Sequence, residues 1–169
     1  FEQADAIMLS GETTVGKYPL RCIEVFDRIA RRIERSGSAN YHERAEFTSP
    51  RQKLVRSAVI LADQLKADAL LVFTIRGNMA RHAASCRPRY APIYAICEFP
   101  GVADSLTFNW GVESFVHSFN HEKPEQTVES ALHWLVEQGR LRRGNTAVII
   151  SAISAGDQII DVVEMRVVA

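Results

Sequence analysis

The chain has 169 residues, of which 47% are hydrophobic and 24% charged, a composition typical of a globular domain with a substantial core. Lysine plus arginine and aspartate plus glutamate number 20 each, so bulk electrostatics predict no nucleic-acid partner. No apolar run approaches the length of a membrane span, and the three cysteines form no spaced pair typical of a metal or redox motif. We therefore expect reduced thiols, no membrane partner and a cytoplasmic location.

The first 36 residues predict a strand followed by a helix. Residues 6–9 are an apolar run that ends at Ser10, and a polar loop then leads to Pro19, a residue favoured at the first position of a helix. Apolar side chains recur every three or four residues in that helix, at Ile23, Phe26, Ile29 and Ile33. Because the chain has no initiator Met and reaches a strand almost at once, we expect a fragment of a longer protein.

Residues 37–48 are polar and have no apolar periodicity, so they predict a linker at a domain boundary. Ser49, Pro50 and Gln52 then supply the N-cap, the first-turn proline and the capping-box residue of a new helix. We expect that helix to bury one face, formed by Leu54, Ala58, Leu61 and Leu65.

Short apolar runs predict buried strands at residues 69–73, 93–97 and 146–151, and a further strand is expected at residues 112–116. Helices are expected between them, from about 79 to 86, from 102 to 108, and from Pro124 to Gly139. After the last buried run, Val163, Met165 and Val167 alternate with charged residues, which predicts an antiparallel strand with one exposed face at the sheet edge.

The fold class is therefore α/β: a three-layer, Rossmann-like sandwich preceded by the strand–helix pair. Its five-stranded sheet is mostly parallel, with an antiparallel edge strand and with residues 69–73 in the centre. Ligands of such sheets bind outside the carboxyl ends of the strands, so residues 74–78 are the expected binding loop. The loop SGETTVGKYP presents hydroxyls and a carboxylate beside Lys17 and could contact a phosphate, a sugar or a monovalent cation, or be an ordinary turn.

The first twenty residues closely resemble the last strand–helix unit of the pyruvate kinase catalytic barrel, in the stretch ADAIMLSGETTVGKYPL. The matching positions are Asp5, residues 7–13, Gly16, and residues 18–20. Weaker similarity continues in order through CRPRYAPIYAIC, WGV, GRLRRGN and EMRVV.

This resemblance implies a pyruvate kinase fragment: residues 1–36 from the end of the barrel, 37–48 as linker, and 49–169 as the C-terminal regulatory domain. The parent enzyme would transfer a phosphoryl group from phosphoenolpyruvate to ADP with Mg²⁺ and K⁺. The groups that hold those ions and the catalytic residues would lie before Phe1, so the fragment is expected to hold no metal or cofactor and to be inactive. Ser10, Glu12 and Lys17 would contribute at most to the nucleotide side of the active site.

The resemblance also implies an effector site for a phosphorylated small molecule, at Thr74, Arg76, Gly77 and Asn78. Thr74 and Gly77 match the family's loop, whereas Arg76 and Met79 replace hydroxyl residues and Asn78 replaces an arginine. The family's second effector loop corresponds to residues 152–157, where Asp157 would repel a phosphate. The sequence is therefore compatible both with a working effector site and with a degenerate one.

Pyruvate kinases are homotetramers, and the edge strand near residues 163–168 is a suitable surface for such pairing. The alternative function is a stand-alone α/β ligand-binding or interaction module derived from that domain. Among the remaining candidates, His82 and Cys86 are spaced like metal ligands, but no further pair supports a metal site, and His117 and His121 are expected to be solvated.

Overall fold

The computed structural model describes residues 4–36, 46–155 and 158–169. The chain divides into two compact units, Phe1–Ala45 and Glu46–Ala169. The expected linker at residues 37–48 falls largely outside the described residues, which resume at Glu46. Among the described residues, no helix is long and apolar enough to cross a membrane.

The first unit contains a short helix, α1 (Gly11–Thr14), and a long helix, α2 (Pro19–Ser36). The expected strand at residues 6–9 does not form: these residues are irregular, and Ile7 and Met8 are 64% and 87% exposed. A strand needs a neighbour to satisfy its backbone groups and cover its side chains, and none of the described residues pairs with this segment. The helix does form from Pro19 as predicted.

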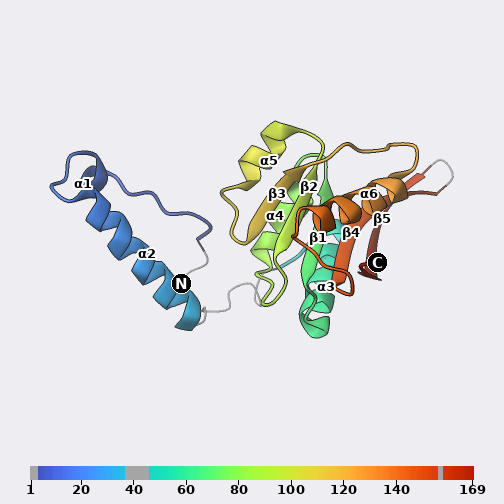
Figure 1. Ribbon diagram of the computed structural model, residues 1–169, viewed down its shortest axis with the longest axis horizontal. Coiled ribbons are helices and arrows are strands. Elements are labelled where there is room, and N and C mark those ends of the chain that lie inside the picture. The colour runs from blue at the N-terminus through green and yellow to red at the C-terminus, as the bar shows by residue number, and fades with distance from the viewer. Residues whose placement is uncertain (1–3, 37–45, 156–157) are drawn as a thin grey trace. The chain divides into compact units, whose positions relative to one another are not determined.

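The second unit is an α/β sandwich whose elements follow one another in the predicted order (Figure 1). Its helices are α3 (Pro50–Leu65), α4 (Asn78–Ser85), α5 (Pro100–Leu106) and α6 (Pro124–Glu137). Its strands are β1 (Ala69–Thr74), β2 (Ile93–Cys97), β3 (Val112–Val116), β4 (Thr146–Ala155) and β5 (Gln158–Val167).

The described residues form a five-stranded sheet in the order β3-β2-β1-β4-β5, which confirms β1 as the central strand. Leu70 pairs with Ile93 on one side and with Val148 on the other, both in parallel register. Only β5 is antiparallel, and it pairs with β4 from Thr146–Val167 to Ala155–Gln158. The strands β4 and β5 are longer than the sequence predicted and continue past the end of β1 as a two-stranded arm.

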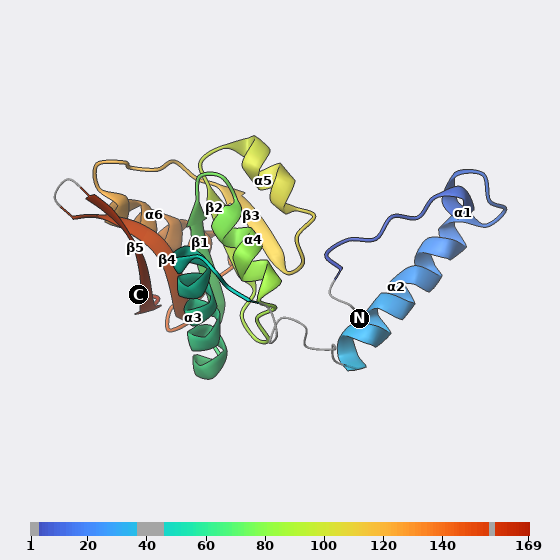
Figure 2. The ribbon, with the colours of Figure 1, turned by 180° about the vertical axis from the view of Figure 1, so that it is seen from behind.

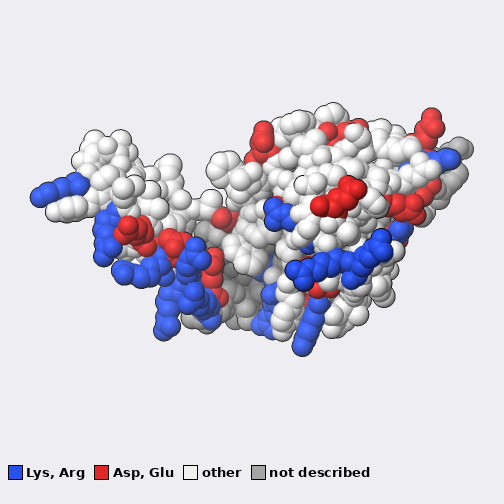
Figure 3. Space-filling model, in the orientation of Figure 1, with Lys and Arg blue, Asp and Glu red and all other residues white. Residues whose placement is uncertain are grey.

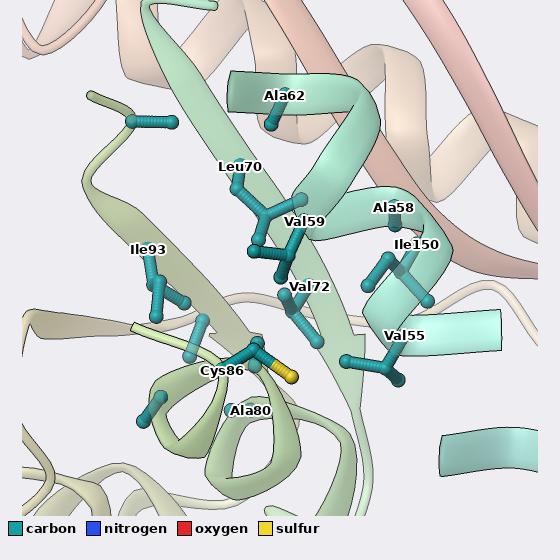
Figure 4. Close-up of a cluster of buried hydrophobic side chains, with 14 of the residues drawn as sticks. Val55, Ala58, Val59, Ala62, Leu70, Val72, Ala80, Cys86, Ile93 and Ile150 are labelled. Atoms are coloured by element: carbon teal, nitrogen blue, oxygen red, sulfur yellow. The ribbon is translucent and has the colours of Figure 1, made fainter. Parts of the chain in front are cut away.

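Helices α3, α4 and α5 cover one face of the sheet and α6 covers the other, so the unit has three layers (Figures 1 and 2). The core on the first face packs alanine-rich helix surfaces against Leu70, Val72 and Ile150 (Figure 4). The core on the second face packs α6 against Leu71, Ile96 and Ile149. Consecutive residues of β1 therefore point into opposite cores, which explains why the strand lacks polar alternation.

The buried face of α3 differs from the prediction. Its fully or nearly fully buried residues are Val55, Ala58, Val59 and Ala62. Leu65 is 43% exposed, while Leu54 and Leu61 are only partly buried. Apolar residues occur on more than one side of this helix, so their spacing alone does not decide which side faces the sheet. The side of α3 that packs on the sheet is the one with small and β-branched side chains.

Charges of both signs are mixed on each unit, on the face shown in Figure 3. This distribution agrees with the equal numbers of acidic and basic residues in the sequence.

Candidate functional site

The loop between β1 and α4 lies at the position where an open α/β sheet binds its ligands. The chain leaves β1 towards β2 and β3 on one side and returns through α6 to β4 on the other side. The strand order therefore reverses next to the carboxyl end of β1, and ligands bind in the crevice at such points. Thr74, Arg76, Gly77 and Asn78 all lie in or beside this loop, as predicted.

The loop is closed by a hydrogen bond between two of these residues. Thr74 ends β1 and is 5% exposed, and its Oγ1 accepts a hydrogen bond of 3.0 Å from the backbone N–H of Gly77. Gly77 is the N-cap of α4 and has φ of +80°, a left-handed conformation that favours glycine. Thr74 and Gly77 therefore shape the turn instead of presenting their polar groups to solvent.

Ile75, Arg76 and Asn78 are the exposed residues of the loop, and of these Arg76 and Asn78 have polar side chains. The Arg76 side chain makes no hydrogen bond or ion pair with the described residues, while its carbonyl oxygen accepts a hydrogen bond from the guanidinium of Arg81 in α4. Asn78 is the first residue of α4, where the early backbone N–H groups have no partner inside the helix and the helix dipole favours an anion. The chemistry of this surface suits an anionic group.

The structure adds two residues that the sequence analysis did not identify, Arg81 and Ser105. Arg81 lies in the first turn of α4 and its guanidinium reaches back to the loop, and Ser105 lies on α5. A signal for Arg81 was present, because it follows Asn78 by three residues and the two therefore share a face of α4. Ser105 gave no signal, since it comes from another helix 24 residues away.

The second expected effector loop is mostly strand. Residues 152–155 belong to β4 and pair with β5, ending at the Ala155–Gln158 pair. Gly156 and Asp157 lie outside the described residues. The described part of this expected loop therefore lies in the paired strands β4 and β5.

The segment from Ser10 to Lys17 forms a small, exposed turn in the first unit. The carbonyl of Ser10 accepts hydrogen bonds from the hydroxyls of Thr13 and Thr14 at 3.0 and 2.9 Å, which start α1. Glu12 lies in the first turn of α1, and the Lys17 ammonium lies 5.5 Å from the centre of the Tyr18 ring. Among residues 4–36, no hydrogen bond or ion pair joins the side chains of Ser10, Glu12 and Lys17.

The described residues contain no group of three or more His, Cys, Asp or Glu side chains that could hold a metal ion. Cys86 is buried in the core beside α3, and burial raises the pKa of its thiol to about 11. Cys97 is also buried, with a pKa raised by burial to about 11. Both thiols therefore stay protonated near neutral pH, so they are structural residues and poor nucleophiles.

The two histidines after β3 differ in their environments. His121 is exposed, and its Nε2 lies 2.8 Å from a carboxylate oxygen of Glu98. His117 is only partly exposed: its Nε2 lies 2.8 Å from the hydroxyl of Ser130, and burial lowers its pKa below 6.5. The prediction that both are solvated is therefore wrong for His117, because Ser130 and Trp134 of α6 lie beside its ring.

Comparison with known proteins identifies the family. Residues 52–163 match the family described as pyruvate kinase, alpha/beta domain. The chain is 30% identical over 170 residues to pyruvate kinase isozyme A, chloroplastic, of Ricinus communis, covering 95% of this chain and 29% of the relative. It is 31% identical over 153 residues to the pyruvate kinase of Mycobacterium tuberculosis (strain CDC 1551 / Oshkosh), covering 90% of this chain and 32% of the relative.

Solved structures agree on the fold. A crystal structure of a pyruvate kinase from Cryptosporidium parvum superposes with a TM-score of 0.75 and 24% sequence identity, covering 96% of this chain and 33% of that chain. The present chain spans about a third or less of the length of these proteins. The family match extends over more than half of the chain, from α3 to β5. The chain therefore belongs to the pyruvate kinase family, whose α/β domain its residues 52–163 match.

Proposed function

We propose that this chain is the C-terminal portion of a pyruvate kinase, an enzyme that transfers a phosphoryl group from phosphoenolpyruvate to ADP to give pyruvate and ATP in glycolysis. The observation that carries the proposal is the match of residues 52–163 to the family's α/β domain. The segment around Ser10, which precedes the predicted linker, resembles the end of the catalytic barrel and gives separate support to the proposal. The three cysteines are free thiols, which supports the cytoplasm or another reducing compartment.

In this proposal the chemistry takes place in the rest of the parent enzyme. The Mg²⁺ and K⁺ ions and the catalytic side chains would be held by residues outside this chain, with Ser10, Glu12 and Lys17 beside the nucleotide. The exposed apolar side chains of α2 support the assignment of the first unit to a larger body: Leu20, Ile23 and Ile29 are 75%, 52% and 54% exposed. Apolar side chains of an amphipathic helix are normally buried against a further layer.

The second unit would serve regulation. The β1–α4 loop would receive the phosphate of a small-molecule effector, with Arg76 as the cationic group and the N-terminus of α4 as the donor surface. Residues 152–155 pair with β5 and therefore do not form a loop that could fold over a second phosphate. We therefore favour an effector with a single phosphate group at this loop.

The second unit would also serve assembly of a homotetramer. The strand β5 lies at one edge of the sheet and pairs with β4 on one side only among the described residues. Ile160, Met165 and Val167 are 45%, 50% and 61% exposed on it. An edge strand with exposed apolar side chains can pair with a second copy.

Two measurements on the whole chain test this proposal. The chain alone should form no pyruvate from phosphoenolpyruvate and ADP in the presence of Mg²⁺ and K⁺, and turnover would contradict the placement of the catalytic groups. A thermal-shift titration with fructose 1,6-bisphosphate, glucose 6-phosphate, AMP and ATP tests the effector site. We expect a stabilising shift that is lost in Arg76→Ala and kept in Arg142→Ala, an exposed arginine in the turn before β4. No shift with any of them would contradict the regulatory role.

The alternative is a stand-alone α/β ligand-binding or interaction module. The discriminating observation is the mass of the protein in its source organism. A polypeptide about three times longer than this chain, with pyruvate kinase activity, supports the enzyme, whereas a mature protein of 18.9 kDa supports the module.

A further inference from the structure

The guanidinium of Arg81 joins three parts of the second unit at the carboxyl edge of the sheet. Its Nη1 donates to the carbonyl oxygen of Arg76 at 3.1 Å and lies 3.5 Å from Oδ1 of Asn78. Its Nη2 donates to the hydroxyl of Ser105 at 2.9 Å. One side chain from α4 therefore links the β1–α4 loop to α5.

Ser105 is held in place to accept that bond. Its hydroxyl donates to the carbonyl of Val102 at 2.8 Å, one turn earlier in α5. The single hydroxyl hydrogen is thus used within α5, so the oxygen lone pairs face Arg81. The planar fork of arginine can reach a carbonyl and a hydroxyl at the same time, whereas a lysine ammonium has no such geometry.

The loop leaves room for the guanidinium because residue 77 is glycine. A Cβ on Gly77 would lie 3.0 Å from Nη1 and 3.3 Å from Cζ of Arg81, and 3.4 Å from Cδ2 of Leu106. The guanidinium therefore lies directly against the backbone of the turn, with α5 behind it. The φ of +80° favours glycine at this position, and an added Cβ would also make a tight contact with the Arg81 guanidinium.

We propose that Arg81 is a built-in clamp that keeps the β1–α4 loop ordered without any ligand. The Arg81 bonds to Arg76 and Ser105 fix the outer side of the loop, and the Gly77–Thr74 bond fixes its inner side. An anion that arrives at Arg76 then meets a preformed surface instead of ordering the loop itself. The inference rests on the proposed function only in calling this turn the effector loop, since the bonds of the clamp are made between residues of this chain.

Amide hydrogen exchange of Gly77 in the full chain tests the clamp, because this N–H donates to Thr74 Oγ1 inside the loop. We expect the amide to be protected in the unliganded wild type. In Arg81→Ala and Arg81→Lys it should exchange at least about tenfold faster, a factor equivalent to about 1.4 kcal/mol. Ser105→Ala should lie between these variants and the wild type. Arg142→Ala is the matched control and should exchange like the wild type.

Two internal references separate the clamp from general unfolding. The amides of β2 should keep their wild-type protection in every variant, since Arg81 contacts no residue of that strand by a hydrogen bond. Thr74→Val removes the acceptor and gives the exchange rate of an open loop. Unprotected Gly77 in the wild type, or unchanged exchange in both Arg81 variants, would overturn the proposal.

Inorganic phosphate provides the complementary arm. If the clamp already orders the loop, saturating phosphate should change the exchange rate of the Gly77 amide in the wild type by less than about twofold. A decrease of that rate by about tenfold or more would show that the ligand orders the loop and would contradict the clamp. This result is independent of whether a sugar phosphate or nucleotide shifts the melting temperature. A failure of the clamp proposal would therefore be seen in the exchange of the Gly77 amide, whereas a failure of the effector proposal would be seen in the thermal-shift titration.

Discussion

The side chains of Arg51 and Asp161 form an ion pair of 2.7 Å between Nε and Oδ2, although 110 residues separate them in the sequence. Arg51 lies in the first turn of α3, and Asp161 lies on β5 near the start of the two-stranded arm. This ion pair therefore connects the first turn of α3 to the two-stranded arm, the part of β4 and β5 that extends beyond β1.

We predict that the Arg51–Asp161 pair contributes modestly to stability, because the Arg51 side chain is 70% exposed and solvent screens the attraction. A double-mutant cycle with Arg51→Ala and Asp161→Asn should give a coupling free energy of about 0.5 kcal/mol that decreases in high salt. Urea unfolding of the wild type, both single variants and the double variant measures it. Coupling energy that does not change with salt would contradict an electrostatic origin.

Ser49→Ala should destabilise the second unit by about 1 kcal/mol. The Ser49 hydroxyl accepts from the N–H of Gln52 at 3.2 Å, and the Gln52 side chain accepts from the N–H of Ser49 at 3.1 Å, a complete capping box. Ser57→Ala is the control, since that hydroxyl bonds the carbonyl of Lys53 in the same helix and caps nothing. Equal unfolding midpoints for the two variants would show that the cap contributes little.

The capping box also shows which features the sequence predicts well. Ser49, Pro50 and Gln52 act through contacts within one turn, so their pattern identified the first residue of α3. The buried strands β1 and β2 were equally clear, because each faces a core on both sides and β2 begins and ends where its apolar run does. The strand β3 also forms over the predicted range, but it lies at the sheet edge and is only partly buried, because no strand covers its outer side among the described residues. Features that depend on contacts within one turn, or on burial of a whole strand, can therefore be predicted directly from the sequence.

Features that depend on distant partners were not visible. The segment at residues 6–9 has the composition of a strand but finds no neighbour among the described residues. The arm is formed by pairing between β4 and β5, and the pattern of polar and apolar residues did not predict that this pairing extends so far. The contact between Arg81 and Ser105 joins two helices, and only the fold brings them together.

Gly77→Ala should destabilise the chain by about 1 kcal/mol or more, because alanine is strained at φ of +80° and its Cβ would press on the Arg81 guanidinium. Gly101→Ala is the matched control. Gly101 lies in α5, and a Cβ added there would lie within 4 Å of no described residue other than its chain neighbours and the backbone of its own helix. Its substitution should leave the free energy of unfolding unchanged or raise it slightly. Thermal unfolding followed by circular dichroism compares them, and equal effects would contradict the strained turn.

Stability should fall as the pH is lowered from about 7.5 to about 5.5, in part because of His117. Burial lowers the pKa of this histidine below 6.5, so the unfolded state takes up the proton at a higher pH than the folded state. The stability present above pH 6.5 is therefore lost as the pH falls towards the lower, folded-state pKa. His117→Gln should reduce the slope of unfolding free energy against pH, measured by urea titration.

His133→Gln is the control for this slope, because the His133 side chain is 77% exposed on α6. We expect it to leave the dependence on pH close to that of the wild type. Indistinguishable slopes for His117→Gln and the wild type would contradict the role of the partly buried imidazole beside Ser130.

A shortened chain that begins at Glu46 should fold as well as the full chain. Among the described residues, those that form the two hydrophobic cores of the sandwich lie between Phe47 and Val168, and the compact unit begins at Glu46. Removing residues 1–45 therefore takes none of these described core side chains away. The melting temperature followed at Trp110 and Trp134 should stay within about 2 °C of the full chain, which is less than a change of about 1 kcal/mol would produce. A decrease of about 5 °C or more, or a loss of cooperativity, would mean that the first unit contributes to the stability of the second.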